Sequence, residues 1–237
     1  MKIVLLPGLD GTGKLFNQFS SLLPSFLTVD IYTLPINGEQ EPRALAESLA
    51  LEKLLNEDIF IIAESFSGRI AYELIKYRKD KIKGIILVSS FLSVPHPVLK
   101  LTRWLPLSFF PWHWAPAWAI RLFCVGIDAS DDLVRQVLNA INSVPAYIIS
   151  ARIKALCKLR QPQDKIDIPC LYLQPSADRL VPKWHAEMIR ALFHNFTMRV
   201  IPGPHFLLQA NPKECIESVM EFVGSITKQR GTGAPLS

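Results

Sequence analysis

Continuous apolar runs that alternate with helical patterns restrict this chain to few folds. Strands are predicted at residues 2–6, 27–32, 58–63 and 83–89, and helices at about 14–23, 43–55 and 68–77. A strand that is apolar on both faces must be covered on both faces, as in parallel sheets. The sequence therefore predicts an α/β fold with a mostly parallel central sheet and helices on both of its faces.

The alternation is interrupted once. It stops after residue 91, and residues 92–160 are rich in Pro, Trp and Arg with a mostly helical pattern. Strands are predicted again at 170–174 and 198–201, and helices at 184–192 and 212–226. A length of 237 residues fits one domain with one insertion. We predict a core formed by 1–91 and 161–230, a helical lid insertion at 92–160, and a disordered tail at 231–237.

The predicted insertion carries the whole net charge of the chain. Residues 97–160 hold eight Lys and Arg residues against three Asp residues, which equals the net charge of +5. Such a segment either attracts an acidic partner or is a solvated face. If it binds a partner, the candidate docking residues are Arg103, Arg121, Arg135 and Arg152. We predict no nucleic-acid partner.

Nothing in the composition indicates a membrane span or a metal. The uncharged stretch 104–120 contains three prolines, which would break a spanning helix. The apolar run at the N-terminus is too short for a secretory signal. The four cysteines are scattered and are expected to be reduced thiols, which favours a cytoplasmic location. No compact metal-ligand spacing is present, so we predict no metal and no organic cofactor.

Ser65 lies where a predicted strand turns into a helix, in Glu-Ser-Phe-Ser-Gly. A serine at such a turn exposes its hydroxyl as a nucleophile, and the amide of Phe66 then points toward an oxyanion. The usual motif is Gly-x-Ser-x-Gly, and here Ala63 and Ser67 replace the glycines. Both are small enough for a tight turn. The alternative is that Ser65 only caps the helix.

A glycine-rich loop, Leu-Pro-Gly-Leu-Asp-Gly-Thr-Gly, follows the first predicted strand. In a hydrolase, the amide of Leu9 would be the second oxyanion donor. The segment from Gly8 to Lys14 also matches most of a phosphate-binding P-loop. Leu15, however, stands where Ser or Thr should bind magnesium, which weakens the nucleotide interpretation. A plain turn is the third possibility.

Asp178 and His205 each follow a later predicted strand. Functional groups of open α/β sheets lie in such loops. Taken alone, Asp178 could cap a helix and His205 could be structural. The other four histidines lie at or in the insertion, within a helical pattern, or before a strand.

Ser65, Asp178 and His205 occur in the order that serine hydrolases of one superfamily use. The chain resembles the α/β-hydrolase superfamily over nearly its full length, with residues 92–160 at the lid position. The glycine loop and the serine turn look like those of its esterase, acyltransferase and thioesterase branches. The insertion is similar to that of the esterases that demethylate pimeloyl-acyl-carrier-protein methyl ester. Pro7, in place of a frequent histidine, and Ser67 depart from the pattern.

The resemblance implies a serine carboxylic ester hydrolase that acts through an acyl-enzyme. His205 would be the general base, Asp178 would orient it, and the amides of Leu9 and Phe66 would hold the oxyanion. The implied substrate is an acyl-chain ester such as pimeloyl-acyl-carrier-protein methyl ester of biotin synthesis, with an acidic acyl carrier protein as partner. A thioesterase or acyltransferase is the alternative within this fold. A nucleotide-binding protein and a non-catalytic binding module remain as other classes.

Aromatic side chains gather in the predicted insertion. They are suited either to contact an acyl chain or to form the core of a lid. The candidates are Trp104, Phe110, Trp112, Trp114 and Trp118.

Overall fold

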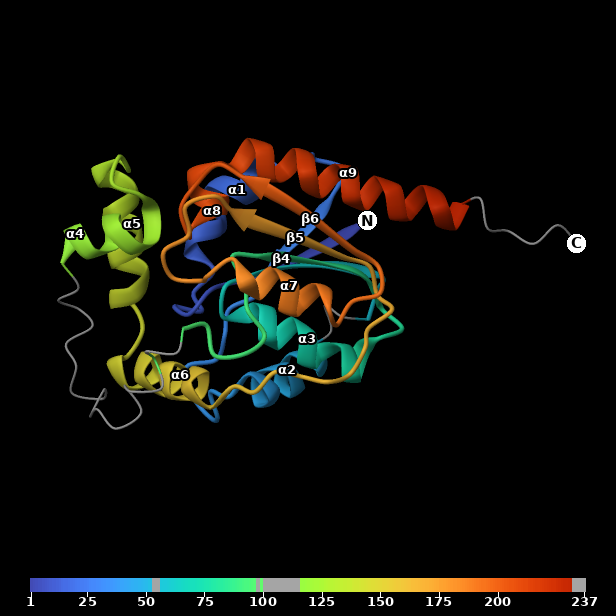
Figure 1. Ribbon diagram of the computed structural model, residues 1–237, viewed down its shortest axis with the longest axis horizontal. Helices are drawn as coiled ribbons and strands as arrows, with labels where there is room; N and C mark the ends of the chain where they lie inside the picture. Colours follow the sequence, from blue (N-terminus) through green and yellow to red (C-terminus); the bar gives the residue numbers. More distant parts are fainter. Residues whose placement is uncertain (53–55, 97–98, 100–115, 232–237) are drawn as a thin grey trace, which may run out of the picture.

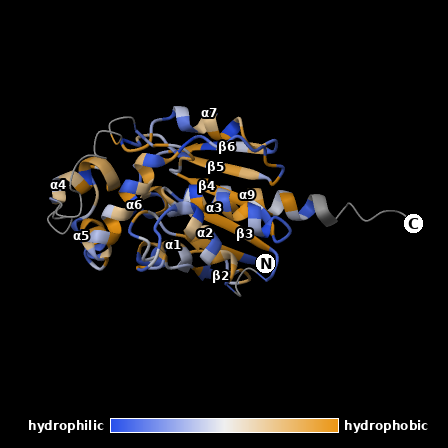
Figure 2. Cartoon of the chain, turned by 90° about the horizontal axis from the view of Figure 1, so that it is seen from below, coloured by the Kyte–Doolittle hydropathy of each residue, from blue (hydrophilic) through white to orange (hydrophobic). Residues whose placement is uncertain are grey.

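A computed structural model describes residues 1–52, 56–96, 99 and 116–231 of the chain. Six strands form one sheet in the order β2-β1-β3-β4-β5-β6, and all neighbouring strands are parallel. They are β1 (Lys2–Leu6), β2 (Thr28–Ile31), β3 (Ile59–Glu64), β4 (Ile82–Val88), β5 (Cys170–Pro175) and β6 (Phe196–Ile201). Strands β1, β3 and β5 are buried at every residue, and Figure 2 shows the strands of the sheet mainly in the hydrophobic colour. The α/β prediction is confirmed.

Helices cover both faces of the sheet (Figure 1). One layer holds α2 (Pro42–Ala50), α3 (Ser67–Arg78) and α7 (Trp184–Arg190), and the other holds α1 (Asn17–Ser21), α8 (Leu207–Ala210) and α9 (Pro212–Gly231). Alternate residues of a strand point to opposite faces. Accordingly, Val4 packs in the core beneath α2 and α3, whereas Ile3 and Leu5 pack in the core beneath α9.

The order of the strands brings two loops together. The chain leaves β1 for the edge strand β2 and then returns to β3 on the other side of β1. Leu6 therefore pairs with Ala63 at the carboxyl ends of β1 and β3. Such a change of direction opens a crevice beyond the strand ends, where α/β proteins bind ligands.

In the described part of residues 92–160, four helical elements lie at that end of the sheet (Figure 1). They are α4 (Ala117–Ile120), the π-helical turn η6 (Arg121–Val125), α5 (Asp131–Asn142) and α6 (Ala146–Lys158). Ser130 caps α5 by accepting a hydrogen bond from the amide of Leu133. These elements come from the segment whose sequence pattern was mostly helical.

One predicted helix is shorter than its pattern. Residues 14–23 form only a 3₁₀ turn, η1 (Lys14–Phe16), followed by the short α1. Ser20 and Ser21 donate their hydroxyls to backbone carbonyls within the same turn, and Pro24 follows shortly. Serine competes with regular helix formation in this way. In the described part of the chain, no helix is long and apolar enough to cross a membrane.

Candidate active site

Ser65 lies in the turn between β3 and α3 with a left-handed backbone conformation. Its φ is 51°, and its amide donates to the carbonyl of Val88 at 2.9 Å. A residue other than glycine rarely adopts this backbone conformation unless its surroundings impose it. Gly68 makes the turn possible, because a Cβ at this position would lie 2.6 Å from the Cβ of Ser90. Glycine is therefore required at residue 68, one position after the usual motif.

His205 and Asp178 lie beside Ser65. The Nε2 atom of His205 is 3.0 Å from the hydroxyl of Ser65, and its Nδ1 atom is 2.9 Å from Oδ2 of Asp178. Asp178 also accepts the amides of Leu180 and Val181, at 2.8 and 2.9 Å. His205 is 3% exposed. The three side chains, which come from three separate loops, thus form one hydrogen-bonded triad.

Leu9 and Phe66 both lie beside this triad. Leu9, Phe66, Ser65 and His205 line the same cavity. Among the described residues, neither amide donates to a protein acceptor. A Cβ on Gly8, which precedes Leu9, would lie 3.9 Å from the Cβ of Ser65. Two unpaired amides beside a serine hydroxyl are the donors that an oxyanion needs.

Pro7 and Ser67, which both depart from the superfamily pattern, contact each other. The hydroxyl of Ser67, the first residue of α3, donates to the carbonyl of Pro7 at the end of β1. Both residues are buried. This hydrogen bond ties the serine turn to the glycine loop, so one departure supplies the partner of the other.

Glu64, the residue before Ser65, carries a second buried carboxyl group. It is 1% exposed, and among the described residues Gln209 is its one hydrogen-bond partner, with Nε2 at 3.5 Å from Oε2. Its Oε1 atom has no partner among the described residues. Burial, reinforced by the negative charge of Asp10 and opposed by the hydrogen bond from Gln209, raises the pKa of Glu64 to about 8. Glu64 is therefore mostly neutral at pH 7.

An apolar cavity of about 390 Å³ begins at Ser65 and His205. Helical elements α4 to α6 supply much of its wall, through Ile120, Cys124, Val137, Ile141, Ile149, Ile153 and Leu156. The core supplies other apolar residues, including Leu15, Phe91 and Phe206. No lysine or arginine is among the described residues of the lining. Such a cavity suits an uncharged hydrocarbon chain.

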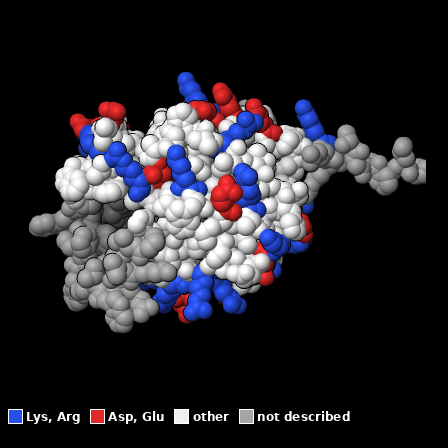
Figure 3. Space-filling model, in the orientation of Figure 1, with Lys and Arg blue, Asp and Glu red and all other residues white. Residues whose placement is uncertain are grey.

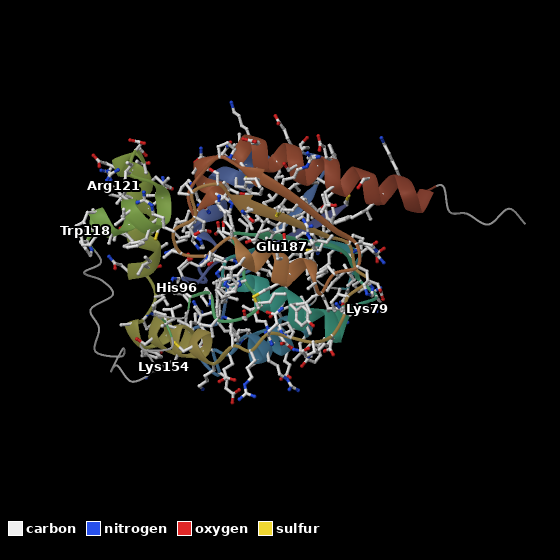
Figure 4. The ribbon with its side chains drawn as sticks, viewed as in Figure 1. Lys79, His96, Trp118, Arg121, Lys154 and Glu187 are labelled. Carbon is white, nitrogen blue, oxygen red and sulfur yellow. The ribbon has the colours of Figure 1, made fainter. Side chains whose placement is uncertain are left out.

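The structure overturns two predictions about the helical segment. Arg152 is completely buried, so its assignment as a docking residue is wrong. Its side chain lies on the apolar face of α6 and binds backbone carbonyls of the core. Trp118 is 65% exposed, does not line the cavity, and lies at the outer end of α4 (Figure 4). It is therefore neither an acyl contact nor part of a lid core.

The remaining predicted residues of this segment are only partly described. Arg121 bonds with Asp131 and Arg135 with Asp132, so ion pairs occupy both candidate docking side chains. On the face seen in Figure 3, Lys and Arg are interspersed with Asp and Glu. The other candidates lie outside the described residues: Arg103, Trp104, Phe110, Trp112 and Trp114.

The glycine loop does not have the layout of a phosphate site. The carboxylate of Asp10 lies within the loop and accepts both the amide and the hydroxyl of Thr12. A phosphate would need that amide, and the Asp10 charge would repel it. Lys14 is exposed at the start of η1. Within the described residues, no cluster of three or more His, Cys, Asp or Glu side chains could hold a metal ion.

The comparisons with known proteins agree with this geometry. A family model described as serine aminopeptidase, S33, matches residues 43–205. The chain belongs to this family. It is a serine hydrolase with the α/β-hydrolase fold. No curated protein matches the sequence.

Several solved structures share the fold at low sequence identity. A thermophilic esterase from Thermogutta terrifontis is 18% identical with a TM-score of 0.77, covering 95% of this chain and 90% of that chain. A hydrolase from Oleispira antarctica is 15% identical with a TM-score of 0.73 and the same two coverages. The RedJ thioesterase from the prodiginine pathway in Streptomyces coelicolor is 20% identical with a TM-score of 0.65, again covering 95% and 90%.

Proposed function

We propose that this serine hydrolase cleaves carboxylic esters of apolar acyl chains through an acyl-enzyme at Ser65. One observation carries the proposal. Ser65 and His205 of the hydrogen-bonded triad with Asp178 line a cavity whose remaining lining is almost entirely apolar.

Each residue of the triad has a defined role in this mechanism. His205 takes the Ser65 proton at Nε2 as the serine oxygen attacks the ester carbonyl. Asp178 accepts a hydrogen bond from the protonated Nδ1 of His205 and stabilises the imidazolium. The amides of Leu180 and Val181 hold the Asp178 carboxylate in place. The negative charge that develops on the carbonyl oxygen is bound by the amides of Leu9 and Phe66. His205 then protonates the leaving alcohol, and water releases the acid by the same steps in reverse order.

The cavity favours a neutral acyl chain. Because its described lining contains no cation, a free carboxylate there would lose hydration without gaining a partner. A methyl ester is uncharged, whereas its product acid is not. We propose that a carrier-bound ester such as pimeloyl-acyl-carrier-protein methyl ester meets this requirement, and that residues 92–160 act as a lid over it. The peptidase activity in the family's description would need an acidic group that binds a charged amino terminus. Asp10 is the only acidic residue in the described lining, and its carboxylate is already bonded to Thr12, which favours an ester over a peptide.

Covalent labelling followed by substrate profiling tests the proposal. A fluorophosphonate should label Ser65, as located by peptide mapping, and Ser65→Ala should abolish labelling. Hydrolysis of p-nitrophenyl esters should become faster as the acyl chain grows from two carbons, until the cavity is full. The exposed Ser225→Ala is a matched control and should label as wild type. An unlabelled Ser65 without esterase activity would refute the proposal.

A thioesterase is the second candidate, since the RedJ thioesterase shares the fold. Oxygen esters and thioesters of the same acyl group, each measured as kcat/KM, separate the two activities. A carrier partner is tested by Arg135→Glu, whose side chain is 67% exposed. If an acidic carrier docks here, this variant loses turnover of carrier-bound esters and keeps turnover of p-nitrophenyl esters. Equal loss on both excludes docking at Arg135.

A further inference from the structure

Arg152 is a buried cation that the proposed mechanism has not used. It belongs to α6, and its side chain is among the largest that are fully buried in the described part of the protein. Burial lowers the pKa of Arg152 to about 10, so its guanidinium stays charged at neutral pH. Within the described residues, no carboxylate lies within ion-pair distance of it. A buried charge is costly unless hydrogen bonds compensate it.

The compensating partners come mostly from the glycine loop. Nη1 donates to the carbonyls of Leu9 and Asp10, at 2.9 and 2.7 Å. Nε donates to the side-chain oxygen of Gln40 at 2.9 Å, and Nη2 to the carbonyl of Pro35 at 3.1 Å. One side chain thus binds both central residues of the turn that carries the Leu9 amide.

The turn is built around this guanidinium. The amide of Gly11 donates to the carbonyl of Gly8 at 3.1 Å, which closes the turn over Leu9 and Asp10. Gly11 has a φ of +72°, and a Cβ there would lie 2.4 Å from Nη1 of Arg152. Any other residue at position 11 would displace the arginine or the loop. Gly11 and Arg152 therefore depend on each other.

We propose that Arg152 is a positioning residue that holds the Leu9 amide where the oxyanion forms. The proposal rests on the proposed ester hydrolysis at Ser65. Leu9 has a free amide on one side and a carbonyl fixed by Arg152 on the other, so its backbone cannot turn without breaking that hydrogen bond. A shift of about 1 Å at a catalytic donor is enough to cost a hundredfold in rate.

The same helix also reaches the substrate cavity. Ile149, Ile153 and Leu156 of α6 line the cavity, while Arg152 points to the loop. A movement of α6 would therefore change the cavity wall and the Leu9 amide together. In this way, the structure links the helical segment to the chemistry at Ser65.

The test compares Arg152→Met and Arg152→Lys with wild type. Methionine removes the charge and all four hydrogen bonds. Lysine keeps the charge but lacks the planar guanidinium with its several donors. We expect Arg152→Met to lower kcat about a hundredfold with KM nearly unchanged, and Arg152→Lys to fall between it and wild type. Lys158→Met is the matched control on α6, because the exposed Lys158 ammonium pairs with Glu41, its one ion-pair partner among the described residues, and the variant should behave as wild type.

A second readout separates positioning from a structural role. An alkyl trifluoromethyl ketone forms an oxyanion on Ser65, whereas the alcohol of the same chain length does not. In Arg152→Met, affinity for the ketone should fall by the same factor as kcat/KM, and affinity for the alcohol should persist. If Arg152→Met does not fold, Gln40→Leu keeps the arginine and removes the acceptor of its Nε, together with the hydrogen bonds that the Gln40 amide nitrogen donates to the carbonyls of Asn37 and Gly38. It should show the same pattern with about a tenfold loss, as for one hydrogen bond to a charged group.

The two proposals fail in different ways. Unchanged ketone affinity in a folded variant, or a loss confined to KM, would overturn the role of Arg152 and leave ester hydrolysis standing. If wild-type Ser65 did not react with a fluorophosphonate, the hydrolytic proposal would fall, and the role of Arg152 with it.

Discussion

The buried carboxyl of Glu64 should make the protein less stable as the pH rises. Its pKa lies at about 8 in the folded state, against a reference value of 4.5. Between these values the folded state keeps a proton that the unfolded state has lost, so the free energy of unfolding falls with increasing pH. Each unit of pKa shift corresponds to about 1.4 kcal/mol, which gives a total loss of roughly 5 kcal/mol, complete above pH 8. Glu64→Gln keeps a neutral side chain of similar shape and should remove this loss.

Urea unfolding from pH 5 to pH 9 measures the effect. The wild-type midpoint should fall over this range much more than that of Glu64→Gln, because other titrating groups act equally on both proteins. Glu217→Gln, an exposed substitution on α9, should follow the wild type. If wild type and Glu64→Gln lost the same free energy of unfolding between pH 5 and 9, Glu64 would not be the protonated group that its burial implies.

Three further outcomes follow from the geometry. Asp178→Asn should lower kcat for ester hydrolysis by about 10⁴ with little change in melting temperature, because its remaining oxygen still accepts the amides that hold the loop; unchanged kcat would exclude Asp178 from the mechanism. Ile149→Trp should fill part of the cavity and shift the preferred p-nitrophenyl ester to a shorter acyl chain, which a chain-length series would reveal. Burial lowers the pKa of His185, so the unfolded state takes up its proton first and stability is lost as the pH falls through about 6.5; His185→Gln should reduce that loss in urea unfolding between pH 5 and 7.

The sheet was predictable because its strands are buried on both faces. A strand such as β3 has no polar face, so its apolar run is uninterrupted and its limits are visible in the sequence. Helix α1 is shorter than its sequence pattern predicts, because hydrophobic spacing alone does not set its limits. Its apolar spacing is helical, but Ser20 and Ser21 bond to their own turn, and this local competition is not visible in hydrophobic spacing.

The neighbourhood of Ser65 followed from topology more than from its motif. Loops after parallel strands meet at one edge of the sheet, so residues following β3, β5 and β6 were expected to converge there. The hydrogen bond between Ser67 and Pro7 was not predictable, because it exists only once β1 and β3 are neighbours. Nor could the sequence give the pKa of Glu64, which depends on burial beneath Gln209 and beside Asp10.

The docking prediction for Arg152 rests on its charge alone, whereas its position in α6 indicates burial. Ile148, Ile149, Ile153 and Leu156 form an apolar stripe along α6, and Arg152 lies within that stripe. An arginine there must be buried, and its donors must find acceptors outside its own helix. A loop that leaves the Leu9 amide unpaired has no regular partner for its carbonyls either, and buried carbonyls need donors. The planar guanidinium can serve several carbonyls at once. Arg152, whose charge alone suggests a surface contact, is therefore the residue whose donors the glycine loop requires.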